Sequence, residues 1–431
     1  MNQSWVDASR INRAPTTDIW AVDHTAHPLL DPDFARSGSR LLYLIRMTFR
    51  RILKSDEAYR HELARLFGPV GEDDADLPPL KTLLHRAAEY LREADIYLAS
   101  TINLLPLEGQ AAILPQAVIT GCMDVRDLLG ISIHGDSPLL RYEARRKLAL
   151  ALYLLQIDQS RSIQDGDRHK STFEQMLNEG LWRHSKQIHD LRVGYRMDDD
   201  GTSIRYTLRP GPDDMVWDFR STFVEKTRGG RSVALDILYY NCRFKRSVTP
   251  ISFEEIDGRR RVVENARWGE MRGETSGSML SKMIRKGINN PEEIGDIIGA
   301  MFIVHDNDAL TDLLVLLDSC LGTPFGWRNV TDTLLPRPAG AALNTFSSKD
   351  FKVFKGDIDL LCDGGGGAPY RFPVEIQIHT LESYLRTVCG EHEASHVALK
   401  LRQFLFGLAP KLFPREVYGE AWLLGNGLRT D

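Results

Sequence analysis

Hydrophobic and polar positions follow a helical period through the first half of the chain. From residue 37 to about 187, apolar residues recur every three or four positions, which is the spacing of one face of an α-helix. The clearest stripes cover residues 41–52, 80–94 and 139–157. We therefore expect a helical domain over residues 36–200. Residues 1–35 mix Pro, Asp, Thr and Ala without a period and are expected to form an irregular N-terminal arm.

The third stripe carries four cations on its polar side. They are Arg141, Arg145, Arg146 and Lys147. A run of charges on an amphipathic helix usually marks its solvated face, and that is the interpretation we favour over a binding site.

The pattern changes from a helical to a strand period near residue 200. Segments 203–209, 216–226 and 233–245 are rich in Val, Ile, Tyr, Phe and Thr, which favours strands. Turn residues at 227–231 and 257–258 predict two hairpins, the second between strands 252–256 and 260–263. These segments define a β-rich connecting region over residues 201–265. Its cations either contact phosphates or an RNA backbone, or keep an exposed sheet soluble; they are Lys226, Arg228, Arg231, Arg243, Lys245 and Arg246.

Helices and strands alternate in the last part of the chain, residues 266–431. Expected helices cover 276–286 and 309–321 and lie within 380–406, and expected strands cover 300–304, 352–361 and 370–378. Asn290-Pro291 opens a further short helix, because a capping residue precedes a proline at the first helical position. The glycine run at 364–367 lacks the Lys-Ser/Thr of a P-loop and is expected to be a hairpin tip. The fold class is therefore α+β.

Composition narrows the class of protein. The chain has 431 residues, of which 42% are apolar, and a net charge of −5, which suits several globular domains and argues against a protein that coats nucleic acid. Its five cysteines are scattered, without a C-x-x-C pair, as in reduced cytoplasmic proteins. Neither a signal peptide nor an uncharged apolar stretch of membrane-spanning length is present in the sequence. We expect a cytoplasmic protein without a membrane partner, and leave a homo-oligomer open.

Two carboxylates occur on or beside the expected C-terminal strands. Asp296 stands just before the apolar segment 300–304. Glu375 lies in a strand whose alternation places Glu375, Gln377 and His379 on one face. A surface strand is the ordinary interpretation of that face. A glutamate in an otherwise apolar strand, however, calls for a partner, and Mg²⁺ is a natural one. If the strands pair, Asp296 and Glu375 would hold a Mg²⁺ ion that bridges ATP phosphates.

A basic helix precedes these carboxylates. Ser278 and Lys282 are four residues apart and share one helical face near the helix N-terminus, with Arg272 before them and Lys286 after them. Such an arrangement suits the phosphates of a nucleotide, although an amphipathic surface helix has the same pattern.

The ordered series of motifs resembles the synthetase domain of the RelA/SpoT family, which makes guanosine tetra- and pentaphosphate. The family pattern R-x-K-x-x-x-S-x-x-x-K is matched from Arg272 to Lys282, and K-x-x-R-K-G from Lys282 to Gly287. The pattern D-x-x-G-x-R is matched from Asp296 to Met301, and E-I-Q-I-R-T from Glu375 to Thr380. A trailing H-x-x-x-K corresponds to His396 and Lys400.

The resemblance implies a nucleotidyltransferase-like mixed sheet with flanking helices over residues 266–431. It also implies an enzyme that transfers pyrophosphate from ATP to a ribose 3′-hydroxyl of a nucleotide or an RNA end. Asp296 and Glu375 would hold Mg²⁺, and Glu375 would help deprotonate the hydroxyl. The family roles assign the ATP phosphates to Arg272, Ser278, Lys282 and Lys286, and the acceptor to Phe346, Gln377 and His379.

The chain departs from the family at several positions. Glu274 replaces a lysine, and Met301 and His379 each replace an arginine. The tyrosine that stacks on guanine corresponds to Phe346 in Asn344-Thr-Phe-Ser-Ser348. No alarmone-hydrolase signature of two acidic pairs is present in the sequence. Two alternatives therefore remain, namely a non-catalytic nucleotide or RNA sensor and an enzyme of the same fold that transfers a nucleotide.

Overall fold

A computed structural model gives the architecture of thirteen stretches of the chain. The described residues are 49–68, 77–105, 107–198, 203–228, 231–244, 251–256, 259–264, 277–288, 290–321, 326–334, 351–362, 369–389 and 395–419. The expected arm over residues 1–35 lies outside them, as do Arg272 and Phe346.

The chain divides into two compact units, each made of separated segments. Unit 1 comprises Met1–Gln164, Ser276–Ile294 and Leu401–Asp431, and unit 2 comprises Asp165–Thr275 and Gly295–Lys400. This division does not follow the four expected segments. Helix α12 (Gly277–Lys286), expected in the C-terminal catalytic domain, belongs to unit 1, whereas the expected β-rich region falls in unit 2 with the C-terminal strands.

The described part of unit 1 is built from helices. Their starts follow local sequence signals: Ser137 accepts a hydrogen bond from the Leu140 amide at 3.1 Å, and Pro138 occupies the first turn of α8. The elements are α3 (Asp56–Phe67), α4 (Leu80–Ile102), α5 (Leu107–Ala111), α6 (Ala117–Thr120), α7 (Val125–His134), α8 (Pro138–Asp158), α9 (Arg161–Gln164), α12, η4 (Pro291–Glu293), η5 (Phe404–Leu408), α16 (Ala409–Leu412) and α17 (Arg415–Tyr418). Helix α15 (His396–Gln403) contains the boundary between the units.

Three of the four cations on the basic side of α8 are buried and Arg141 is half-buried, so the interpretation of this side as a solvated face is wrong. Arg145, Arg146 and Lys147 are 4%, 1% and 3% exposed. The Arg146 guanidinium donates to the Leu412 carbonyl at 2.7 Å and lies 4.9 Å from the centre of the Phe413 ring. The Lys147 ammonium donates to the Asp95 carboxylate at 2.7 Å. The burial of Arg146 and Lys147 is compatible with their charge, because carbonyl and carboxylate partners satisfy it.

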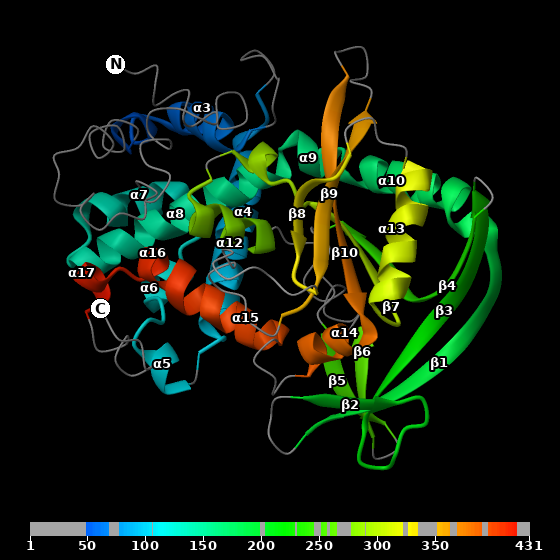
Figure 1. Ribbon diagram of the computed structural model, residues 1–431. Coiled ribbons are helices and arrows are strands. Elements are labelled where there is room, and N and C mark those ends of the chain that lie inside the picture. Colours follow the sequence, from blue (N-terminus) through cyan, green and yellow to red (C-terminus); the bar gives the residue numbers. More distant parts are fainter. Residues whose placement is uncertain are drawn as a thin grey trace. The chain divides into compact units, whose positions relative to one another are not determined.

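Unit 2 is built around one mixed sheet (Figure 1). Its main path runs β2-β1-β3-β4-β7-β10-β9-β8, and β6 pairs with β3 and β5. The strands are β1 (Ser185–Met197), β2 (Ile204–Thr207), β3 (Met215–Arg228), β4 (Arg231–Phe244), β5 (Ile251–Ile256), β6 (Arg259–Glu264), β7 (Ile298–Val304), β8 (Arg328–Asp332), β9 (Phe354–Cys362) and β10 (Tyr370–Thr380). The helical elements of unit 2 are α10 (Gly166–Gly180), η3 (Trp182–His184), α13 (Asn307–Leu321) and α14 (Leu381–Val388).

Strand β1 begins earlier than the expected change of pattern near residue 200. Most of its residues before Val193 are exposed or half-buried, so apolar alternation is weak there. Its pairing with β3, for example Asp190 with Arg220, determines its conformation through long-range contacts that a local pattern does not reveal.

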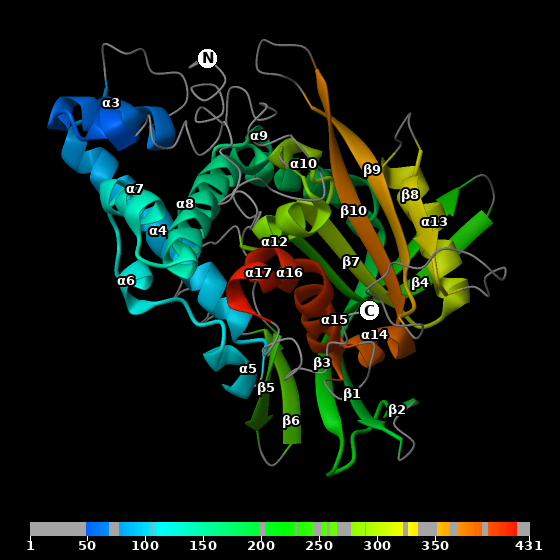
Figure 2. The same ribbon diagram turned by 90° about the vertical axis from the view of Figure 1, so that its left-hand side faces the viewer.

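The sheet joins segments that the sequence analysis assigned to different regions. Strand β4 pairs antiparallel with β7, β7 pairs parallel with β10, and β10 pairs antiparallel with β9. Figure 2 shows β7, β10 and β9 side by side. Helices α10 and α13 contact these strands, and α14 contacts β7 and β10. A mixed α+β fold is therefore confirmed.

No helix in the described stretches has the length and apolar character required to cross a membrane.

Candidate functional site

The register of the β9–β10 hairpin brings polar residues together on one face of the sheet. Glu375 lies opposite Asp357, and Gln377 lies opposite Lys355. Directly opposed residues of antiparallel strands point to the same side, and residues two apart on one strand share that side. Lys355, Asp357, Glu375 and Gln377 therefore form one polar cluster.

Glu375 is buried, so a simple surface strand does not describe this face. It is 1% exposed, and His379 on the same strand is 3% exposed. The Gln377 side-chain amide donates to Glu375 Oε1 at 2.5 Å, and the Lys355 ammonium forms a salt bridge with Glu375 Oε2. Burial of a carboxylate is costly unless such partners are present.

Asp357 is a third carboxylate of this cluster, and sequence reasoning missed it. It is 8% exposed and accepts a hydrogen bond from the Asn329 side-chain amide at 2.8 Å. Burial raises the pKa of Asp357, and the negative charges of Glu375 and Asp296 raise it further, against the lowering effects of Asn329 and Lys355. Asp296 is half-buried in the turn directly before β7. Glu375 and Asp296 thus both act electrostatically on Asp357.

Further cations and a strained backbone border the carboxylates. The Arg328 guanidinium contacts Asp359, whose side chain is 0% exposed, and an Arg371 nitrogen lies 4.0 Å from the same carboxylate. Asn329, which binds Asp357, has a φ of 50°. A non-glycine residue in the left-handed region costs conformational energy and often occurs at functional sites.

The cluster fits a hard divalent cation in its donor chemistry. Carboxylate and amide oxygens are the ligands that Mg²⁺ prefers, and a cation would relieve the repulsion from Glu375 and Asp296 that adds to the effect of burial on the pKa of Asp357. Among the residues that the structure describes, however, no group of three or more His, Cys, Asp or Glu side chains is arranged to hold a metal ion. In this geometry Lys355 supplies the positive charge next to Glu375.

Three expected phosphate-binding residues, Ser278, Lys282 and Lys286, lie in a different unit from the carboxylates. Helix α12 buries Met279, Leu280, Met283 and Ile284 in unit 1, and Lys411 donates to the Ile284 carbonyl at its C-terminal end at 2.8 Å. On its other side, Ser278 and Lys286 are exposed and Lys282 is half-buried. The structure does not bring these three residues together with Asp296 and Glu375 within one unit.

The expected acceptor residues have different environments. Gln377 binds Glu375, as described above. His379 packs against Phe351 and Tyr384, with ring centroids 6.1 and 5.7 Å away. These contacts indicate a packing role for His379. The expected base-stacking residue Phe346 lies outside the described residues.

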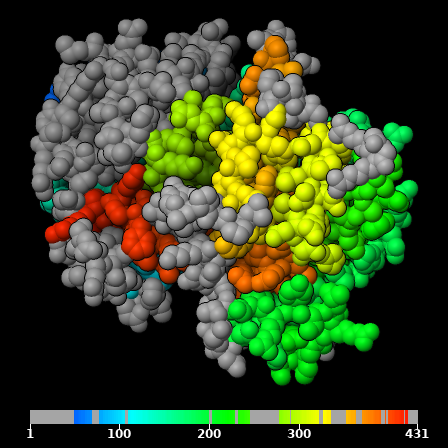
Figure 3. All heavy atoms as spheres, in the orientation of Figure 1, coloured from blue at the N-terminus to red at the C-terminus, as the bar shows by residue number. Residues whose placement is uncertain are grey.

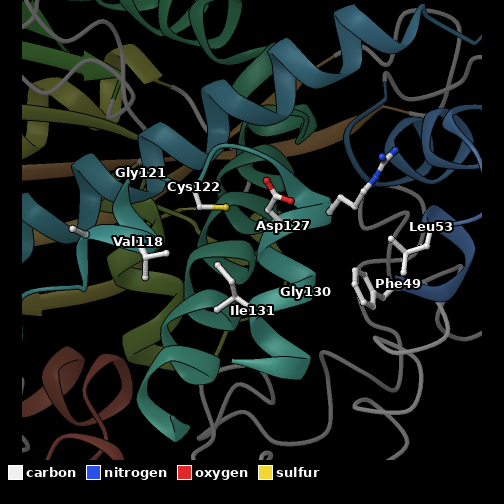
Figure 4. Close-up of a pocket in the computed structure, with 10 residues that line it drawn as sticks. Phe49, Leu53, Val118, Gly121, Cys122, Asp127, Gly130 and Ile131 are labelled. Atoms are coloured by element: carbon white, nitrogen blue, oxygen red, sulfur yellow. The ribbon is translucent and has the colours of Figure 1, made fainter. Parts of the chain in front are cut away.

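A cavity of about 680 Å³ lies elsewhere, in unit 1. Figure 4 shows Phe49 and Leu53 on one side and Val118 and Ile131 on the other. Cys122 also lines it, and burial raises the pKa of its thiol. Its lining is mostly apolar and lacks the grouped carboxylates of unit 2, so the polar cluster on β9 and β10 is the stronger candidate for chemistry.

Comparisons with known proteins leave the family open. Neither a family model nor a curated protein nor a solved structure matches this chain.

Proposed function

We propose that this protein is a Mg²⁺-dependent transferase related to the RelA/SpoT synthetases, with a nucleotidyltransferase-like fold. The reaction is transfer of pyrophosphate from ATP to a ribose 3′-hydroxyl of a nucleotide or an RNA end. The supporting observation is the electrostatic effect of both Asp296 and Glu375 on Asp357 at neighbouring strands of a mixed sheet. Clustered carboxylates of this kind suit metal-assisted phosphoryl transfer.

The chemistry assigns a role to each side chain. Bound Mg²⁺ would neutralise charge that develops on the transferred phosphates. Asp296 and Glu375 would be its ligands, with Asp357 as a third carboxylate. Gln377 orients Glu375 through its hydrogen bond of 2.5 Å. Lys355 would leave Glu375 for a phosphate oxygen when the metal ion binds, because its side chain is 39% exposed and attached to a flexible stem.

One observation favours a second candidate, a non-catalytic nucleotide or RNA sensor. The Lys355 ammonium already neutralises Glu375 within the protein. A lysine that stays on Glu375 would keep the cluster stable without metal, as expected after loss of catalysis. Transfer of a nucleotide instead of pyrophosphate has no comparable support.

Product analysis distinguishes these functions. The protein is incubated with Mg²⁺, with GDP, GTP, ADP or tRNA as acceptor, and with ATP labelled at the α- or γ-phosphorus. Pyrophosphate transfer moves only the γ label to the acceptor, nucleotide transfer moves the α label, and a sensor moves neither. Because Glu274 and Met301 stand where the family has cations, we expect GDP and GTP to be poor acceptors.

Three amide variants test the site. Asp296→Asn, Asp357→Asn and Glu375→Gln should each lower turnover at least about a hundredfold, since losing a metal ligand removes several kcal/mol of transition-state stabilisation. Asp213→Asn is the matched control, because Asp213 is an exposed loop carboxylate in the same unit. Wild-type turnover in Glu375→Gln at saturating Mg²⁺ would show that the assigned site is wrong.

A further inference from the structure

A second cluster of polar and ionisable side chains lies on the side of the β9–β10 hairpin opposite to the carboxylates. Cys362 ends β9 and Tyr370 begins β10, and the two residues are paired in the sheet. Both have even numbers, so they lie on the face opposite to Asp357 and Glu375. His169 of helix α10 is 1% exposed on that face, and its ring packs 4.1 Å from the ring of Phe372.

Hydrogen bonds connect these residues in a chain. His169 Nδ1 lies 3.3 Å from the Cys362 sulfur, and His169 Nε2 lies 2.7 Å from the Tyr370 hydroxyl. The Tyr370 hydroxyl donates to Asp165 Oδ2 at 3.0 Å. An Arg168 nitrogen lies 3.3 Å from the Tyr370 oxygen and 3.1 Å from Asp165 Oδ2.

The Asp165 carboxylate, the last acceptor in this series, determines the donor and the acceptor of each hydrogen bond in it. An ionised carboxylate accepts hydrogen bonds and donates none, so in its bond with Asp165 the Tyr370 hydroxyl is the donor. The Tyr370 oxygen then accepts from His169 Nε2–H. With the proton on Nε2, Nδ1 carries a lone pair, and that lone pair faces the Cys362 thiol.

Such an arrangement makes His169 a base for the Cys362 thiol. When the thiol proton moves to Nδ1, a thiolate and an imidazolium form, and Asp165 stabilises the imidazolium through Tyr370. A nucleophile, a base within hydrogen-bond distance and a third group that orients the base are the parts of an activated thiol. The thiolate, not the thiol, is the reactive form of cysteine.

We propose that Cys362 is an oxidant-sensitive thiol that His169, Tyr370 and Asp165 activate, and that its reactant is a small hydroperoxide. Cys362 is 8% exposed, which favours a reactant the size of hydrogen peroxide over a bulky electrophile. In Figure 3 described parts of β9 and β10, in orange, are visible at the surface at the top of the view.

The reaction balances with groups that are present. The Cys362 thiolate attacks one peroxide oxygen, an S–O bond forms and the O–O bond breaks. Sulfur loses two electrons and becomes a sulfenic acid, and the second oxygen leaves as hydroxide. His169 returns the thiol proton to this hydroxide, so one water molecule is released.

The size of the activation follows from thiol chemistry. A thiol with the usual pKa of about 8.5 is about 3% ionised at pH 7. A base that raised the ionised fraction of such a thiol to about one half would raise the thiolate fraction about fifteenfold. Nucleophilicity falls as the thiol pKa falls, with a slope of about 0.4–0.5, so the net gain in rate is about threefold.

The experiment compares two Tyr→Phe variants of the full chain. Each protein is treated with hydrogen peroxide, sulfenic acid is trapped with dimedone, and modification of Cys362 is followed by mass spectrometry from pH 5 to 9. Tyr370→Phe keeps the ring and removes the hydroxyl that joins His169 to Asp165. Tyr206→Phe is the control, because Tyr206 lies in β2 and is 40% exposed.

We expect Tyr370→Phe to slow modification of Cys362 about threefold at pH 7 and to shift the midpoint of the rate profile to higher pH. Tyr206→Phe should match the wild type. Equal rates and midpoints in the two variants, or no sulfenic acid at Cys362 in the wild type, would overturn the proposal. Neither result depends on the pyrophosphate transfer proposed above, because the assay contains no nucleotide.

Discussion

The salt bridge between Lys355 and Glu375 offers a measurable test of the electrostatics of the polar cluster. The Glu375 side chain is 2% exposed and that of Lys355 is 39% exposed. Replacing Lys355 by methionine keeps most of the apolar stem and removes the charge. Glu375 then remains buried with the hydrogen bond from Gln377.

The expected cost follows from the geometry. Two unit charges about 4 Å apart attract each other by about 4 kcal/mol at an effective dielectric constant of about 20. Solvent screens part of this attraction because Lys355 is more than a third exposed, which leaves about 2 kcal/mol. For a unit of about 200 residues, that loss lowers Tm by about 4–8 °C.

Calorimetry of a double-mutant cycle and one control variant isolates the interaction. Wild type, Lys355→Met, Glu375→Gln and the double variant are unfolded at pH 7 in EDTA, with Lys186→Met as an exposed control on β1. Lys355→Met should cost about 2 kcal/mol in the wild-type background and less than about 0.5 kcal/mol beside Glu375→Gln. Millimolar Mg²⁺ should stabilise Lys355→Met more than the wild type, since the lysine competes for the same carboxylate. Equal costs in both backgrounds would refute the inferred pairing.

Two further predictions concern charges in the two units. Burial and neighbouring carboxylates raise the pKa of Asp357 in the folded protein. The contribution of Asp357 to the free energy of unfolding is therefore fully present below the unfolded pKa of about 3.9, and it is lost as the pH rises through the raised folded pKa. Asp357→Asn should therefore be more stable than the wild type in urea unfolding at pH 7, and the difference should vanish at acidic pH; a constant difference across pH would contradict the assignment. Arg146→Ala should cost about 3–5 kcal/mol by the same measurement, because it breaks a buried charged network, whereas the exposed Arg92→Ala should change stability by less than about 0.5 kcal/mol. A loss below about 1 kcal/mol for Arg146→Ala would mean that its buried contacts do not stabilise the fold.

Local patterns predicted the strands that carry the cluster. Strand β7 was recognised from its apolar run and β10 from its alternation, and both are present with bounds close to those expected. Asp357 was not identified from the sequence. Charged residues occupy every second position of Lys355-Gly-Asp-Ile-Asp359, as they do in a strand with one face in solvent. The proximity of Asp357 to Glu375 depends on the register of the hairpin, which a single strand does not reveal.

Helix α8 shows that local patterns are equally unable to predict the burial of a charged side chain. Arg146 was expected to face solvent because a run of charges on an amphipathic helix usually marks its solvated face. Its hydrogen-bond acceptor is the carbonyl of Leu412, 266 residues further along. Helical periodicity identifies the face of a helix, whereas the partner of a buried charge is determined by tertiary contacts.

The distance along the chain between Arg146 and Leu412 has a consequence for biosynthesis. Unit 1 is completed by residues after position 400, so its first segment is made long before its last. At about 5–20 residues per second, a ribosome needs about 13–53 s to add the 266 residues that separate the cation from its acceptor. During that interval the nascent helix α8 carries a cation without the carbonyl that satisfies it in the finished protein. The final packing of α8 therefore follows synthesis of the segment that contains Leu412, and until then its cation is exposed to competing interactions.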